Sequence, residues 1–236
     1  MSFVNAFTPE RIAEAWNCLL NEFPFALWET LYSTILATFF AIVIGLPLGV
    51  ILVTGEQKGI RPLPRVLMNF LNILINLLRS IPFIILMVMI IPLTRVIVGT
   101  SVGTVASIIP LTVAAFPFIA RLVESSLREL NPNIIETAQS MGATPMQIVM
   151  KVMLPESVPS LITNFTLAIT TIMGYTAMSG AVGGGGLGKL ALSYGYQRYR
   201  YLILYLAVIV LVVITQVLQS FGTWLARKCD KRLRNK

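Results

Sequence analysis

Long stretches of apolar residues, separated by short polar segments, dominate the pattern along this chain. A helix that crosses a bilayer needs about 20 mostly apolar residues, and each stretch is long enough. The predicted spans cover about 30–54, 66–94, 102–123, 157–180 and 201–226. The pattern therefore predicts an all-α, polytopic membrane protein with five transmembrane helices per subunit.

The distribution of basic residues predicts which terminus faces the cytoplasm. Because the number of predicted spans is odd, the two termini must lie on opposite sides of the membrane. With the N-terminus outside, twelve basic residues face the cytoplasm, several of them in the tail 228–236: Lys58, Arg61, Arg65, Arg121, Arg128, Lys151, Arg227, Lys228, Lys231, Arg232, Arg234 and Lys236. Five remain outside: Arg11, Arg95, Lys189, Arg198 and Arg200. Basic residues concentrate on the cytoplasmic side, so we expect an N-out/C-in orientation.

Residues 1–27 precede the first predicted span. They carry three glutamates and a single basic residue, Arg11, which is the wrong charge for a cleavable signal peptide. Their apolar residues are interrupted, which favours a short interfacial helix over about 9–21. We therefore expect an external or interfacial N-terminal segment, with targeting left to the first span.

Composition narrows the chemistry that the chain can perform. Of its residues, 56% are hydrophobic and 12% charged, whereas soluble domains carry about 25% charged residues. The sequence contains no histidine, the commonest metal ligand and near-neutral acid or base. Cys18 and Cys229 would face opposite sides of the membrane, so neither a disulfide nor a zinc site is expected. The net charge of +8 is better explained by membrane orientation than by nucleic-acid binding.

Several helix-breaking or charged residues interrupt the predicted spans. Prolines 47, 82, 92, 110 and 117 each remove a backbone hydrogen bond. They indicate either kinks in a packed bundle or irregular helices that line a translocation path. Arg79 is either a functional intramembrane charge or, together with Pro82, the mark of a break near an interface or within a dimer. We favour the break, because too few apolar residues follow Arg79 to cross the membrane.

The glycine-rich run at 183–189 reads GGGGLGK and matches most of a phosphate-binding loop. The position after it should be Ser or Thr to hold magnesium, but Leu190 stands there. The same run fits a dinucleotide-binding fingerprint, yet neither match follows a predicted strand. A flexible or closely packed external connection is the better interpretation.

The predicted cytoplasmic segment 131–155 has clear signals for two short helices. Asn131 followed by Pro132 is typical of a helix start, and a first helix would run to Met141. It would stop at Gly142, because glycine readily adopts the left-handed conformation of a helix end.

A second helix is predicted to start at Thr144, which forms a capping-box pattern with Gln147, and to end at Pro155. Three side chains of the first helix share a small apolar face: Ile134, Ala138 and Met141. This face indicates either a helix lying on the membrane surface or a docking element for a soluble partner, and periodicity does not choose between them.

Residues in this segment resemble the cytoplasmic EAA motif of bacterial ABC importer permeases. The matching residues are Glu136-Thr137-Ala138, Gly142, Ile148 and Leu154-Pro155, with Thr137 in place of the usual alanine. Further stretches are similar to the methionine ABC transporter permeases, namely 78–86, 91–100, 117–121, 142–149 and 180–188. The resemblance covers roughly residues 28–227 and leaves the N-terminal segment without a function.

The resemblance implies a non-catalytic permease subunit in the bacterial inner membrane that moves L- and D-methionine into the cytoplasm. It implies a homodimer, two copies of a cytoplasmic ATPase and an extracytoplasmic solute-binding lipoprotein. This chain would bind no cofactor, with ATP and Mg on the ATPase. By match, the coupling helix would contact that ATPase through Glu136, Thr137, Ala138, Met141 and Gly142.

The solute path is less clear from the sequence. Met173, Tyr175, Met178 and Ser179 could offer a soft, amphipathic lining, although we favour packing in the core as their explanation. A permease for another small amino acid and a channel remain alternatives. A secondary transporter would usually carry carboxylates inside its spans, and the acidic residues here lie at span edges. An enzyme would need a catalytic cluster that the sequence does not supply.

Overall fold

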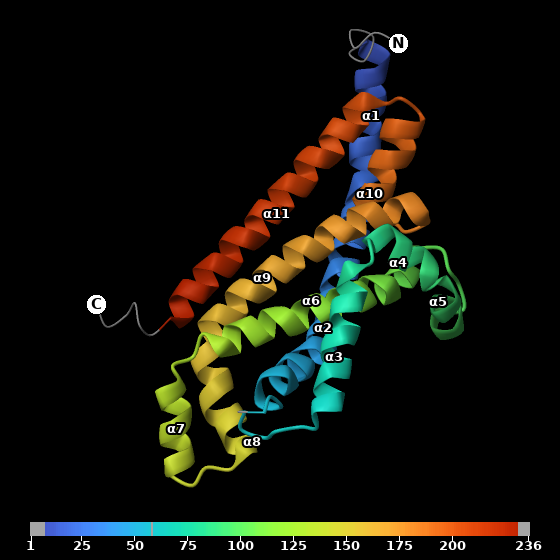
Figure 1. Cartoon of the computed structure of the whole chain (residues 1–236). Coiled ribbons are helices and arrows are strands. Elements are labelled where there is room, and N and C mark those ends of the chain that lie inside the picture. Colours follow the sequence, from blue (N-terminus) through green and yellow to red (C-terminus); the bar gives the residue numbers. More distant parts are fainter. Residues whose placement is uncertain (1–7, 58, 231–236) are drawn as a thin grey trace. The chain divides into compact units, whose positions relative to one another are not determined.

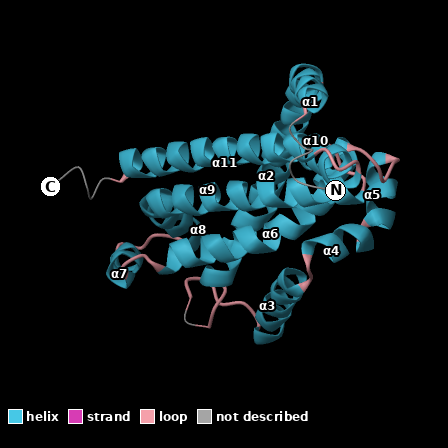
Figure 2. Ribbon diagram, turned by 90° about the horizontal axis from the view of Figure 1, so that it is seen from above, coloured by secondary structure: helices cyan, strands magenta, loops and turns pink. Residues whose placement is uncertain are grey.

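The computed structural model describes residues 8–57 and 59–230, and every regular element in this part of the chain is a helix (Figures 1 and 2). Four helical stretches are long and apolar enough to cross a membrane: α2 (Phe23–Thr54), α6 (Thr104–Arg128), Pro145–Val182 and α11 (Tyr201–Cys229). The predicted all-α membrane class is confirmed. The predicted cytoplasmic residues Lys58, Lys231, Arg232, Arg234 and Lys236 lie outside the described residues.

The chain forms two compact units, and each is described by itself. Unit 1 comprises residues 1–38, 82–113 and 169–218, and unit 2 comprises residues 39–81, 114–168 and 219–236. The long helices α2, α6, α9 (Leu154–Ser179) and α11 each contribute a segment to both units.

The second predicted span, 66–94, is not one continuous helix. The structure has α3 (Arg65–Ser80), α4 (Phe83–Met89) and α5 (Ile91–Val98) in its place, so the count is four spans, or five if α3 and α4 together form one broken span. Pro82 disfavours helical backbone at the preceding residue, and Ile81 is accordingly extended (φ −80°, ψ 124°). Because α3 ends here, Arg79 lies in its last turn, where the helix dipole favours a cation. The Arg79 side chain is exposed. This supports the break near Arg79 that the sequence favoured.

The other prolines fall into two groups. Pro47, Pro110 and Pro117 lie within α2 and α6, which continue through them. Pro82 and Pro92 instead stand at the starts of α4 and α5, where a missing N–H leaves no intrahelical bond unmade. Among the predicted spans that the structure describes, proline therefore interrupts the helix only in the second.

In unit 1, α1 (Pro9–Asn21) confirms the short helix predicted over 9–21. Its Cys18 packs in a buried apolar cluster with residues of α10 (Gly186–Leu190), the π-helix η4 (Ala191–Gln197) and the start of α11. Burial raises the pKa of the Cys18 thiol, and the nearby Glu22 carboxylate raises it further. Arg200 forms an ion pair with Glu14. The N-terminal helix is thus a packed part of unit 1.

The glycine-rich run is closely packed against α2, which is one of the two arrangements the sequence allowed. The Glu29 carboxylate accepts a hydrogen bond from the Gly186 N–H (2.7 Å) and another from the Thr104 hydroxyl (2.6 Å). The Thr30 hydroxyl accepts from the Leu187 N–H (2.9 Å). A carboxylate therefore occupies the helix N-terminus that a phosphate-binding loop would offer to phosphate, which argues against nucleotide binding here.

In unit 2, small residues let α2 approach α6 closely. A Cβ atom at Gly49 would lie only 2.6 Å from both the Ala120 carbonyl oxygen and the Val123 Cβ. Such small residues are typical of helix contacts inside membranes. The α3 side chains Met68 and Ile75 complete the buried cluster beside this contact.

Candidate functional site

The segment that resembles the EAA motif folds through its own local hydrogen bonds, as its sequence predicted. In α7 (Pro132–Ser140), the Asn131 side chain accepts from the Asn133 N–H at 3.0 Å. The helix ends in a Schellman motif, in which Gly142 N–H donates to Gln139 O (2.9 Å) and Ala143 N–H donates to Ala138 O (3.1 Å). Gly142 has φ +75°, the left-handed conformation expected of it.

The second short helix also begins as predicted. At α8 (Pro145–Ile148), the Thr144 hydroxyl accepts from the Gln147 N–H, and the Gln147 side chain accepts from the Thr144 N–H, which completes the capping box. These caps order the turn between α7 and α8 without help from distant residues.

The prediction that Pro155 ends this run is wrong. The chain passes from α8 through a π-helical stretch, η2 (Val149–Met153), directly into α9, whose second residue is Pro155. In an α-helix the proline ring would clash with the Lys151 carbonyl and leave it unpaired. The wider π turn, in which Leu154 N–H bonds to Val149 O, accommodates the proline.

The residues matched to the coupling helix lie together on an exposed surface of unit 2. No residue of α7 is buried, and Met141 is 83% exposed. A Cβ atom added at Gly142 would meet nothing within 4 Å. Glu136 and Thr137 are exposed and Ala138 is partly exposed. Within the described chain this face has no partner, which is the condition that a docking element must meet.

A hollow of about 290 Å³ separates α7 from the end of α2. Its walls are mixed, with Ile135 and Met153 contributing apolar surface and Glu56, Glu136 and Gln139 contributing polar groups. The exposed face of α7 thus continues into a cavity that reaches the end of a membrane helix.

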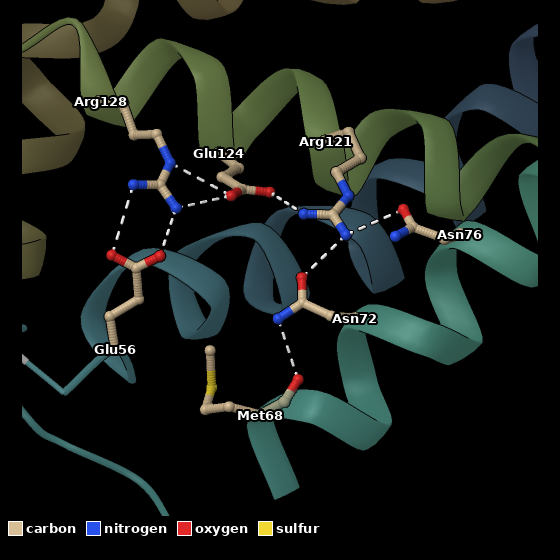
Figure 3. Close-up of polar contacts among 7 residues, drawn as sticks. All are labelled: Glu56, Met68, Asn72, Asn76, Arg121, Glu124 and Arg128. Carbon is tan, nitrogen blue, oxygen red and sulfur yellow. Dashed lines mark hydrogen bonds and ion pairs between the residues drawn. The ribbon is translucent and has the colours of Figure 1, made fainter. Parts of the chain in front are cut away.

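A charge network beside this hollow links the last turns of α6 to Glu56, which follows α2, and to the middle of α3 (Figure 3). The Arg128 guanidinium bridges Glu56 (2.5 Å) and Glu124 (2.8 Å). Glu124 also accepts from Arg121 (2.6 Å), which donates to the side-chain oxygens of Asn72 (2.8 Å) and Asn76 (3.0 Å) on α3.

The sequence analysis did not predict this network, although the residues that α6 contributes have a recognisable spacing. Arg121, Glu124 and Arg128 have the three- and four-residue spacing of neighbours on one helix face. Their partner Glu56 is 72 residues away, and no local pattern could have paired it with Arg128. The network gives the end of α6 a defined position relative to α2 and α3.

The four residues predicted for a solute path differ in their surroundings. Met173 and Ser179 are buried in unit 1, where the Met173 sulfur accepts from the Thr215 hydroxyl (3.3 Å). Tyr175 stacks on Phe83 with ring centroids 4.7 Å apart, and Met178 is exposed. Packing accounts for Met173, Ser179 and Tyr175. A role of any of the four residues in a solute path stays a prediction.

Comparison with known proteins identifies the family to which this chain belongs. The sequence model of the family described as "Binding-protein-dependent transport system inner membrane component" matches residues 45–235, most of the chain. The chain belongs to this family. It is therefore a multi-pass component of the bacterial inner membrane and a permease subunit rather than an enzyme, as the resemblance implied.

Individual relatives cover nearly the whole length. The probable D-methionine transport system permease protein MetI of Vibrio cholerae is 48% identical over 88% of this chain and 92% of its own. The corresponding protein of Pasteurella multocida is 49% identical over 86% and 94%. Among solved structures, a MetNI methionine ABC transporter in an inward-facing conformation matches with a TM-score of 0.84 and 46% identity, over 86% of this chain and 94% of that one.

Proposed function

We propose that this chain is the permease subunit of an ATP-driven importer that carries methionine, in its L and D forms, into the cytoplasm. The observation that carries the proposal is the match to the MetNI transporter, in which sequence identity and backbone geometry agree over nearly the full length of both chains. Membership of the family supports the role in transport, and the similarity to methionine transporters supports methionine as the solute.

We further propose five spans in an N-out/C-in orientation, with α3 and α4 together forming the second span. The excess of basic residues at one end of the predicted spans supports this orientation. In this arrangement α7 and α8 lie in the cytoplasm, and α1 lies on the outer side.

The proposed assembly is a homodimer of this chain with two copies of a cytoplasmic ATPase, supplied by an extracytoplasmic solute-binding lipoprotein. ATP and Mg are bound by the ATPase, and this chain holds no cofactor of its own. The ATPase contacts Glu136, Thr137, Ala138, Met141 and Gly142. Their exposure and the rigid caps around them support this contact, because a preordered element loses little entropy on binding.

The mechanism that follows is alternating access. Closure of the ATPase pair on ATP moves α7, and the continuous path from α8 through η2 into α9 carries that displacement into a membrane helix. Such a transporter needs two packings of similar free energy, which the state of the partner biases.

The experiment is uptake of labelled L- and D-methionine by cells that lack their own methionine importers. The cells express this chain together with an ABC-transporter ATPase and a solute-binding protein from the same organism. ATP-dependent uptake of methionine supports the proposal. A complex that assembles and hydrolyses ATP without methionine uptake would point to another small amino acid, and failure to associate with any ATPase would favour a secondary transporter.

Orientation is tested separately with single cysteines in a background that lacks Cys18 and Cys229. Glu10→Cys and Ser140→Cys both place a thiol at an exposed position. A membrane-impermeant maleimide added to spheroplasts should label Glu10→Cys and should not label Ser140→Cys. Labelling of Ser140→Cys from outside would reverse the proposed orientation.

A further inference from the structure

Two adjoining cavities lie in unit 2 among the end of α6, the start of α9 and the end of α11. Their volumes are about 190 Å³ and 510 Å³. They share four lining residues: Glu129, Pro159, Ser160 and Asp230. The smaller cavity adds Glu156 and Ser157, and the larger adds Arg227. The coupling contact and the solute path proposed above use none of these residues.

The smaller cavity contains a buried polar atom without a partner. Ser157 is only 2% exposed, and its hydroxyl makes no hydrogen bond with any described residue. Leaving a hydroxyl buried and unpaired is unfavourable, because it has lost its hydrogen bonds to water. A ligand in the cavity would relieve this cost.

The remaining polar groups form an ordered wall. The Ser160 hydroxyl lies 2.8 Å from a Glu129 carboxylate oxygen and 3.1 Å from the Ser126 hydroxyl. The Asn164 amide donates to the Ser126 hydroxyl (2.8 Å) and to the Leu122 carbonyl (3.2 Å). These bonds hold the Glu129 carboxylate at the boundary between the two cavities.

The chemistry of the smaller cavity favours a cation with several N–H donors. Three carboxylates line it, from Glu129, Glu156 and Asp230, together with the Ser157 hydroxyl. A primary ammonium has three N–H donors and could satisfy a carboxylate and a hydroxyl at once. A quaternary ammonium has none and would leave the hydroxyl oxygen without a hydrogen-bond donor.

The surface beside the larger cavity favours a ligand that also carries an anionic group and alkyl chains. Arg227 lines this cavity, and the Lys228 ammonium lies 5.1 Å from the centre of the Trp224 ring. The side of α11 that exposes Phe221 and Trp224 is apolar, with Trp224 53% exposed. Aromatic and basic residues arranged in this way are typical of a membrane–water interface.

We propose that the paired cavities bind the headgroup of a phospholipid that bears a primary amine, phosphatidylethanolamine. Its ammonium lies in the smaller cavity against Glu129 and Ser157, its phosphate lies near Arg227, and its acyl chains run along the exposed side of α11. The apolar flank decides for a lipid over a free amino acid, because a small zwitterion would not use it.

The test is lipid retention by the purified full-length chain, measured by native mass spectrometry after exchange into nanodiscs of defined composition. We expect the wild-type chain to retain phosphatidylethanolamine about tenfold over phosphatidylcholine, and Glu129→Gln to lose about that factor, as expected for a hydrogen bond to a charged group. Glu10→Gln, which removes an exposed carboxylate that lines neither cavity, should retain lipid like the wild type.

The substitution Ser157→Ala distinguishes a role of the hydroxyl in lipid binding from a purely structural role. It should lower phosphatidylethanolamine retention and leave the melting temperature of the delipidated chain in detergent unchanged or higher, because it removes an unpaired buried hydroxyl. A lower melting temperature with normal retention would overturn the proposal.

Three further results would also overturn it. The first is equal retention of the two lipids by the wild-type chain. The second is displacement of phosphatidylethanolamine by free methionine, which would assign the cavities to an amino-acid zwitterion. The third is retention of phosphatidylethanolamine that appears only after residues 231–236 are removed. This result would show that the basic tail, rather than lipid, binds to the two cavities.

Discussion

Replacing Gly142 by arginine should abolish transport while leaving the protein folded and inserted. The glycine has φ +75°, and a residue with a side chain pays about 1–2 kcal/mol for that conformation. Native proteins are stable by roughly 5–15 kcal/mol, so this cost alone cannot unfold the chain. A Cβ atom at Gly142 would meet nothing within 4 Å, so the new side chain projects into open space where we place the ATPase.

Two matched variants separate backbone strain from steric exclusion. Asparagine tolerates the left-handed conformation, so Gly142→Asn should cost little stability and add little bulk. Gly142→Ala carries the full backbone penalty with almost no bulk. We therefore expect ATPase co-purification and methionine uptake to be near normal for Asn, modestly lower for Ala, and lost for Arg.

The assay is co-purification of the ATPase with the tagged permease from membranes, with methionine uptake measured in the same strains. Permease content and melting temperature serve as the folding controls. Normal ATPase retention and uptake in Gly142→Arg would refute the docking assignment. Equal losses in the Ala and Arg variants would show that backbone conformation, rather than bulk, controls the contact.

Other predictions follow from packing and charge. Gly49→Ala should destabilise the chain by roughly 1–3 kcal/mol, because its Cβ atom would overlap α6, whereas Gly174→Ala, whose Cβ atom would contact nothing within 4 Å, should be neutral or stabilising in thermal unfolding. Arg128→Met should cost roughly 1 kcal/mol, and the difference from wild type should shrink at high salt, because the Arg128 and Glu56 side chains are half-exposed; a salt-independent loss would contradict an electrostatic origin. Cys18 should react with maleimide far more slowly than the more accessible Cys229, and its rate should rise with pH, because burial and a raised pKa leave little thiolate near neutrality. Equal rates on mass-spectrometric peptide mapping would show that Cys18 is not buried.

Features that depend on neighbouring residues were predictable from the sequence. The cap at Asn131, the left-handed Gly142 and the capping box at Thr144 each involve residues within five positions of one another. The same holds for the short helix over 9–21 and for the long apolar helices, whose formation follows from composition and length.

The predicted break at Pro82 is supported and the predicted helix end at Pro155 is wrong, because the effect of proline depends on the backbone around it. Pro82 ends a helix, since it forces Ile81 into an extended conformation. Pro155 does not, since a π turn precedes it and moves the carbonyl with which it would clash. The sequence marks both positions but does not reveal which backbone geometry surrounds each.

The sequence by itself determined the membrane class, the long apolar helices and the helix–glycine–helix element, because periodicity, length and caps act over a few residues. Only the tertiary structure decided that Glu29 holds Gly186, 157 residues away, and that Arg128 pairs with Glu56, 72 residues away. It also decided that Met173 is buried against Thr215 and that the Ser157 hydroxyl has no partner among the described residues. Such pairings depend on how distant helices pack, and the free energy that selects one packing is distributed over many contacts that leave no local pattern.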